Sequence, residues 1–112
     1  MGYVVNGEEL ESGEDEFLLE ANFSDDVPPV IAAAENPPIV LTDMHWQVIR
    51  FMRERYQEDG HTPNFRNMVA MLDEEDDSVD WKKKLYELFP SQPNRQAARV
   101  AGLPKPFGKG GY

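Results

Sequence analysis

Residues 88–106 read LFPSQPNRQAARVAGLPKP, and the placement of proline and glycine in this stretch predicts one short, sharply bounded helix. Pro93 suits the first turn of a helix, where the missing N–H group of proline leaves no hydrogen bond unmade. Gly102 offers the left-handed conformation that commonly ends a helix, and Pro104 forbids its continuation. We therefore expect a helix over residues 93–101, followed at once by a change of structure.

The ten residues after this helix, 103–112, read LPKPFGKGGY. Proline stiffens a chain and glycine loosens it, so this composition is typical of an arm that is stiff near the body and free at its end. We expect residues 1–102 to form one domain and residues 103–112 to form a flexible C-terminal arm. A chain of 112 residues can bury only one modest core, which agrees with a single domain.

Four further helices are predicted upstream of residue 88. They are expected over residues 27–35 behind Ser24-Asp25-Asp26, over residues 43–59 between a Thr42 cap and Gly60, over residues 62–74 from Thr62-Pro63, and over residues 81–89 behind an Asp80 cap. Apolar residues recur with helical spacing in these segments, which indicates that one face of each is buried. The acidic run at residues 73–77 is interpreted as a solvated loop.

The N-terminal residues predict strands rather than helices. Asn6-Gly7 lies between short extended runs, and this dipeptide favours the positive φ angles of a two-residue hairpin turn. Residues 17–19 are a candidate third strand. The predicted fold class is therefore α+β, with an N-terminal β-hairpin or small meander followed by an array of about five helices and the flexible arm.

Charge is unevenly distributed along the chain, which carries 21 Asp and Glu against 11 Lys and Arg. The first 49 residues contain no basic residue, whereas the segment from Lys82 to the end holds seven bases and a single acid, Glu87. This basic end could meet an acidic surface or a phosphate group on a partner, or it could face the acidic half of its own chain. The formal net charge of −10 argues against general nucleic-acid binding.

Several kinds of chemistry find no support in the composition. The chain contains no Cys, which excludes a disulfide, a thiolate metal site, a persulfide and a cysteine nucleophile. His45 and His61 lack the spacing of a helical metal pair, and structural roles are favoured for both. We expect no cofactor and no metal. The longest apolar run, residues 30–34, is too short to cross a bilayer, so we expect a cytoplasmic protein. We also expect a monomer.

Residues 88–106 also resemble a known family. Leu88-Phe89-Pro90, Gln96-Ala97 and Ala101-Gly102-Leu103-Pro104-Lys105-Pro106 are similar to the LFPxGP, QA and AGLPKP signatures of the DsrC/TusE sulfur-relay proteins. The segment around His45-Trp46 and the spacing of Tyr56, Pro63 and Arg66 agree as well. The chain is identified as a member on this combined match, which implies the family's hairpin and helical array. One departure is Gln92, which stands where the family usually has Gly.

The resemblance implies a function that this chain cannot fully perform. Family members carry sulfur as a persulfide on a cysteine near the end of the C-terminal arm, and in DsrC a second cysteine near the start of the arm can pair with it. The corresponding positions here are Lys109 and Ala98. Because neither an ammonium group nor a methyl group forms a persulfide, we expect no sulfur-carrying catalytic activity.

The first functional hypothesis is therefore a non-catalytic binding or regulatory protein of sulfur metabolism. It would dock onto a sulfite-reductase-like protein, a sulfurtransferase or a regulator. The expected contact residues lie in or near the arm and supply positive charge or an aromatic anchor: Arg99, Lys105, Phe107, Lys109 and Tyr112. One alternative is a sulfur-transfer component of a sulfite-reductase or tRNA-thiolation relay. A second alternative is a DNA-binding regulator in which Lys82, Lys83 and Lys84 lie on the second helix of a helix-turn-helix-like pair.

Overall fold

The structure is a computed structural model that describes residues 2–105 of the chain. Its elements are two strands, β1 (Gly2–Val5) and β2 (Glu8–Glu11), one short 3₁₀ turn, η1 (Glu14–Glu16), and five α-helices: α1 (Val27–Ala34), α2 (Asp43–Asp59), α3 (Phe65–Glu75), α4 (Trp81–Leu88) and α5 (Pro93–Val100). The predicted α+β class, with a hairpin followed by about five helices, is confirmed.

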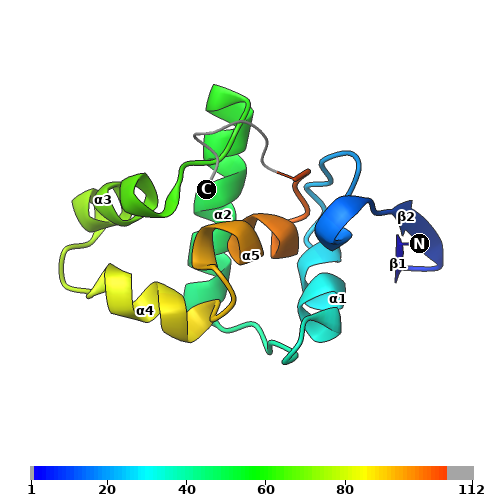
Figure 1. Ribbon diagram of the computed structural model, residues 1–112, viewed down its shortest axis with the longest axis horizontal. Helices are drawn as coiled ribbons and strands as arrows, with labels where there is room; N and C mark the ends of the chain where they lie inside the picture. Colours follow the sequence, from blue (N-terminus) through cyan, green and yellow to red (C-terminus); the bar gives the residue numbers. More distant parts are fainter. Residues whose placement is uncertain (1, 106–112) are drawn as a thin grey trace.

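The hairpin lies at one end of the long axis, and α3 and α4 lie at the other (Figure 1). β1 and β2 are antiparallel, with Val5 opposite Glu8 and Tyr3 opposite Leu10. Asn6 and Gly7 have φ angles of 52° and 83°, as the predicted two-residue turn requires. Alternation along β1 buries Tyr3 and Val5 beneath the hairpin and leaves Val4 exposed.

Helix α5 occupies the middle of the helical array (Figure 1). It packs against all four of the other helices. Its buried apolar residues are small and fully inaccessible to solvent: Ala97, Ala98, Val100 and the adjoining Ala101. Small side chains allow several helices to approach α5 closely, so the core closes around it. The largest buried side chain in this core is Trp81 of α4, whose indole N–H donates to the Asp76 carbonyl at 2.8 Å.

The most accurately predicted helix is α2, whose ends are set by local side-chain and backbone preferences. The Thr42 hydroxyl accepts a hydrogen bond from the His45 amide, and His45 Nδ1 accepts from the Thr42 N–H at 3.0 Å. Nε2 of His45 donates to the Leu88 carbonyl at 2.9 Å, so the ring joins α2 to the end of α4. Burial lowers the pKa of His45, against the opposing effect of its bond to Leu88. The role of His45 is structural.

Three predictions about local structure were wrong. Residues 17–19 form no strand, because Leu18 makes only an isolated bridge to Ser12. Helix α3 begins at Phe65 rather than at Thr62-Pro63, because the Asn64 side chain caps it by accepting from the Asn67 N–H at 2.9 Å. The acidic run at residues 73–77 is exposed for most of its length, but its first three residues continue α3 instead of forming a loop.

The C-terminal end of the described chain remains close to the body. Gly102 adopts a φ angle of 85°, as predicted for the residue after α5, and its carbonyl accepts from the Asn22 N–H at 2.8 Å. Leu103, the first residue of the predicted arm, is fully buried in the core. Lys105 is half-buried against η1. Packing against the domain therefore extends at least to Leu103, and residues 106–112 lie outside the described residues.

Candidate functional site

The residues named by the resemblance converge on α5. Phe89 is fully buried where α4 ends, and Gln96 and Ala97 lie on the buried side of α5. Ala98, where the resemblance places the family's inner cysteine, has no exposed surface. Its methyl group is part of the core, so no reactive or polar group is presented at this position.

A buried carboxylate fixes α5 against α1. Glu35, the residue after α1, is 8% exposed and accepts three hydrogen bonds. Gln96 Nε2 donates to it at 2.8 Å, and Arg99 donates through Nε at 2.9 Å and through Nη2 at 2.6 Å. The two-pronged contact uses the planar shape of both groups and is the strong form of an ion pair. The hydrogen bonds that Arg99 donates to Glu35 raise the pKa of Arg99, against the opposing effect of burial.

The side-chain oxygen of Gln96 also binds the segment that precedes α5. This Oε1 atom accepts from the Ser91 N–H at 2.9 Å. Gln92 follows with a φ angle of 58°, in the left-handed region that glycine adopts most easily. The glycine that the family usually carries at this position would fit the observed backbone better than glutamine. The departure noted in the sequence is therefore a site of backbone strain.

A second, more exposed group of charges surrounds Asp15 of η1. Arg95 Nη2 donates to Asp15 Oδ2 at 2.9 Å, and Lys105 Nζ donates to the same oxygen at 2.9 Å. Lys105 also pairs with Glu14. The hydrogen bond from Lys105 is the main reason that the pKa of Asp15 is lowered, and the bond to Glu14 is the main reason that the pKa of Lys105 is raised. These contacts connect the beginning of the predicted arm to the N-terminal part of the chain.

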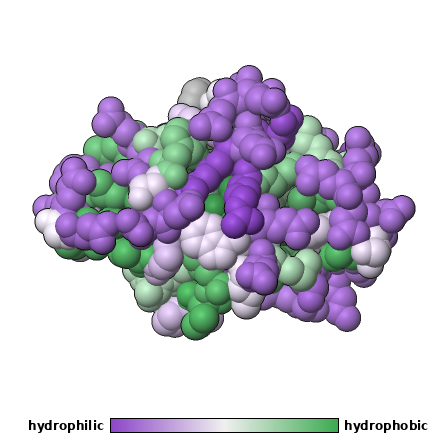
Figure 2. Space-filling view, turned by 180° about the vertical axis from the view of Figure 1, so that it is seen from behind, coloured by the Kyte–Doolittle hydropathy of each residue, from purple (hydrophilic) through white to green (hydrophobic). Residues whose placement is uncertain are grey.

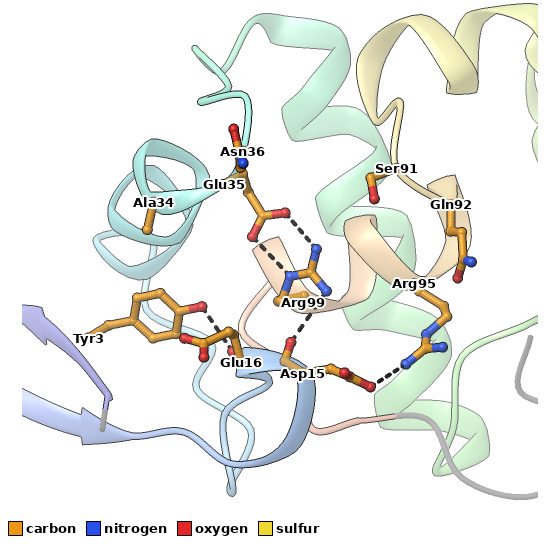
Figure 3. A pocket seen from close by; sticks show the side chains of 10 residues that line it. All are labelled: Tyr3, Asp15, Glu16, Ala34, Glu35, Asn36, Ser91, Gln92, Arg95 and Arg99. Carbon is orange, nitrogen blue, oxygen red and sulfur yellow. Dashed lines mark hydrogen bonds and ion pairs between the residues drawn. The ribbon is translucent and has the colours of Figure 1, made fainter.

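The two groups of charges meet in a pocket of about 430 Å³ between the hairpin end and α5 (Figure 3). Tyr3, Glu16, Ser91 and Gln92 complete its walls together with the residues already described. Arg99 also contacts both groups, because its Nη1 lies 3.4 Å from the Asp15 carbonyl. Its guanidinium carbon is 5.4 Å from the centre of the buried Phe17 ring, which is close enough for a cation–π contact.

Tyr3 marks the apolar edge of this pocket. Its hydroxyl donates to the Glu16 carbonyl at 2.9 Å. Burial raises the pKa of Tyr3 to about 12, and the negative charge of Glu35 acts in the same direction. The phenol therefore remains neutral and serves as a hydrogen-bond donor at physiological pH.

The lining of the pocket is mostly polar and charged. The pocket presents paired charges and hydrogen-bonding groups, and its lining contains no thiol. In the described part of the chain, His, Asp and Glu side chains form no group of three or more that could hold a metal ion. Among the helices of residues 2–105, none has the length and hydropathy needed to cross a membrane.

The basic C-terminal end was expected to face either a partner or the acidic half of its own chain, and the structure decides this for three of its residues. Arg95, Arg99 and Lys105 all pair with acids from the first 35 residues of the same chain. The interpretation that the basic end faces the chain's own acidic half is correct for these residues. The predicted roles of Arg99 and Lys105 in partner binding stay predictions. Three of the predicted contact residues, Phe107, Lys109 and Tyr112, lie outside the described residues.

Sequence reasoning missed three contributors to the site, Tyr3, Asp15 and Glu35. Glu35 is separated from Arg99 by 64 positions, and Arg99 is separated from Asp15 by 84. The local sequence gives no signal that Glu35 is buried, because its partners Gln96 and Arg99 lie on a distant helix. Nothing in the local sequence distinguishes Asp15 from the ten other acids of the first 49 residues.

The helix pair proposed for DNA binding consists of α3 and α4. Lys82 and Lys83 are exposed on α4, whereas Lys84 pairs with Glu87 at 3.1 Å. The last turn of α3 adds three exposed acids, Asp73, Glu74 and Glu75. These carboxylates would repel DNA phosphates that approach the same end of the molecule, so the geometry does not favour this alternative.

Comparisons with known proteins agree with this fold. The family model "DsrC like protein" matches residues 4–108. The chain is 36% identical over 104 residues to the protein named sulfurtransferase TusE of Escherichia coli O6:H1, covering 92% of this chain and 94% of the relative. It is 40% identical to the TusE homolog of Haemophilus influenzae over 104 residues, covering 91% and 94% of the two chains.

A solved structure shows the same architecture. The oxidized gamma-subunit of the dissimilatory sulfite reductase (DsrC) from Archaeoglobus fulgidus superposes with a TM-score of 0.86 at 34% sequence identity, covering 97% of this chain and 99% of that one. Sequence and structure thus agree over nearly the whole described chain, including the α5 region that carries the signatures. The chain belongs to the DsrC-like family of sulfur-relay proteins.

Proposed function

We propose that this chain acts in sulfur relay by binding another protein of the relay, without carrying sulfur on a cysteine of its own. Its similarity to proteins named sulfurtransferases supports a component of sulfur transfer more directly than it supports a regulator. The absence of Cys from the whole sequence supports a non-covalent contribution, because the nucleophile of persulfide chemistry is a thiolate.

The observation that carries this proposal is the state of α5 around Ala98. The inner cysteine position holds a fully buried methyl group, yet Gln96 and Arg99 on the same helix keep a complete set of hydrogen bonds to Glu35. The α5 region is therefore held rigidly without a thiol. A rigid surface of this kind can still be recognised by a protein that also binds sulfur-carrying members of the family.

The partner would approach Lys105 and the neighbouring pocket. The side chains of Glu14 and Asp15, which pair with Lys105, are 77% and 49% exposed. Exposed ion pairs are weak because water competes for both charges, so a carboxylate from a partner can replace either acid at Lys105. Arg99 is less suited to this exchange, because its contact with Glu35 is largely buried.

The test restores a thiol to the outer position by the substitution Lys109→Cys. A matched control, Gln57→Cys, places a thiol on the exposed face of α2. Each protein, including the unsubstituted chain, is incubated with a persulfidated donor protein of a sulfur relay, and intact mass is recorded over time. We expect K109C to gain the mass of one sulfur atom much faster than Q57C, because docking directs the donor to the end of the arm.

The unsubstituted chain is expected to gain no sulfur. A stable gain of sulfur by that chain would contradict the non-covalent part of the proposal and would point to a non-thiol acceptor. Equal rates for K109C and Q57C would contradict the docking part, because the two thiols would then react only by random collision.

A further inference from the structure

The outer edge of β2 is only partly paired and lies beside a groove. Among residues 2–105 the sheet has two strands, so β2 is paired on one side by β1, and no strand of the described residues lies on its other side. In a hairpin closed by a two-residue turn, Val5 and Glu8 exchange backbone hydrogen bonds, and the alternate residue Glu9 directs its N–H and C=O groups away from β1. Exposed groups of this kind are a template for another strand.

The position of a third strand is only partly filled by the chain itself. The Leu19 N–H donates to the Glu11 carbonyl at 3.1 Å, and Leu18 bridges to Ser12. Residues 20–22 line the far side of the groove, and in the described part of the chain they make no backbone hydrogen bond to β2. A groove of about 520 Å³ remains between β2 and residues 18–22.

The lining of this groove combines apolar surface with negative charge. Leu10, Leu18, Leu19 and Ala21 provide the apolar part, and Glu8, Glu9, Glu11 and Glu20 provide four carboxylates. Leu19 is 61% exposed, which is unusual for a large apolar residue and leaves it available for contact. At the hairpin end of the molecule, at the left of Figure 2, hydrophobic surface shows between hydrophilic side chains.

We propose that the β2 edge binds an extended basic segment of a partner protein by strand addition. Backbone hydrogen bonds to Glu9 would supply the pairing, and alternate side chains of the segment would meet the carboxylates and Leu19. The segment must be basic because every charged side chain that lines the groove is acidic. β2 has four residues, so the paired part of the segment would span about 13 Å.

Charge also decides against a second copy of this chain as the occupant. Pairing two β2 edges would bring Glu8, Glu9 and Glu11 of both copies together, and like charges facing each other across a strand pair are destabilising. This surface is separate from the pocket beside α5, so the inference does not depend on the proposed function. A partner could engage it whether or not the chain takes part in sulfur transfer.

The test uses the full chain, labelled for NMR, and a short peptide with blocked ends in which Lys alternates with Val. We expect the largest changes in backbone amide signals in β2 and residues 18–22. Methylation of the peptide nitrogens that face β2 should weaken binding about tenfold or more, because it removes the hydrogen bonds required for strand addition. A peptide with Glu in place of Lys should not bind.

Charge-reversal variants of the chain locate the interaction. The pair E9K/E20K should weaken binding of the Lys-Val peptide about tenfold or more, and the matched pair E54K/E74K, on the exposed faces of α2 and α3, should weaken it less than about twofold. The inference is overturned if the methylated peptide binds equally well, if both variants lose affinity equally, or if the amide changes lie outside the hairpin end. Peptide-independent dimerisation through β2 would also overturn it.

Discussion

Replacing the buried acid Glu35 by Gln tests whether the contact between α1 and α5 stabilises the fold. Glutamine keeps the size of the side chain but has one acceptor oxygen instead of two. The carboxylate now accepts from Gln96 and twice from Arg99. In E35Q, if the amide oxygen of the new glutamine accepts from Gln96, the amide NH₂ group faces the Nε–H group of Arg99. At least one buried donor therefore loses its acceptor.

The expected cost follows from the burial of the pair. Removing one member of a buried ion pair costs about 3–5 kcal/mol, because the remaining charge is left without a partner. The Glu35 side chain is 6% exposed, but that of Arg99 is 16% exposed and gains some hydration. We therefore expect E35Q to lower the free energy of unfolding by about 3 kcal/mol. For a domain of this size that corresponds to a fall in Tm of about 10 °C.

Urea unfolding, followed by circular dichroism, measures this loss. The matched control is Glu58→Gln, which makes the same chemical change in an exposed pair with Arg55 whose Glu58 side chain is 65% exposed. E58Q should cost less than about 0.5 kcal/mol. The argument fails if E35Q and E58Q cost the same within about 0.5 kcal/mol, because Glu35 would then contribute no more than a surface charge.

Three further outcomes are expected. The pKa of His45 is lowered from 6.5, so the unfolded chain binds a proton more readily, and the free energy of unfolding should fall as pH drops through 6.5. This pH dependence should be reduced in H45Q and retained in H61Q. If the free energy of unfolding of H45Q falls with pH as steeply as that of the unsubstituted chain, the assignment to His45 is wrong. Gly60→Ala should cost about 1 kcal/mol for its positive φ alone. Gly102→Ala should lower the free energy of unfolding by at least about 1 kcal/mol more than Gly60→Ala, because its new Cβ would lie 2.6 Å from the main-chain oxygen of Asn22. Equal losses of stability for the two variants in urea unfolding would refute the close approach at Gly102. Gln92→Gly should raise the free energy of unfolding by about 0.5–1 kcal/mol, and a decrease in the same assay would show that its left-handed backbone is not strained.

The fold was predictable where its signals are local. The Asn6-Gly7 turn, the Thr42 cap and the Gly60 terminus each depend on a few neighbouring residues, and all three lie where the sequence indicates. The missing third strand illustrates the opposite case. Phe17 and Leu18 are apolar because both are buried in the core, and a short apolar run does not reveal whether its backbone pairs with a strand.

Only the α5 part of the candidate site was predictable from the sequence. Signature residues directed attention to α5, and the sequence indicated Arg99 and Lys105 as partner contacts, which stays a prediction. Their contacts, Glu35 and Asp15, come from the other end of the chain and carry no local mark. A pattern of charges along a sequence indicates that opposite halves attract each other, but the fold decides which acid meets which base.

The described part of the structure shows how the α5 region keeps its shape with an alanine at position 98. Ala98 fills its place in the core as a methyl group, while Gln96 and Arg99 hold α5 through Glu35. The contacts that stabilise α5 therefore need no thiol at position 98. Under the proposed function, such a chain competes with cysteine-bearing relatives for the same partner. At equal affinity and equal concentration it would occupy about half of the partner molecules and slow the relay accordingly. Its effect on sulfur flow would then depend on its abundance rather than on any turnover of its own.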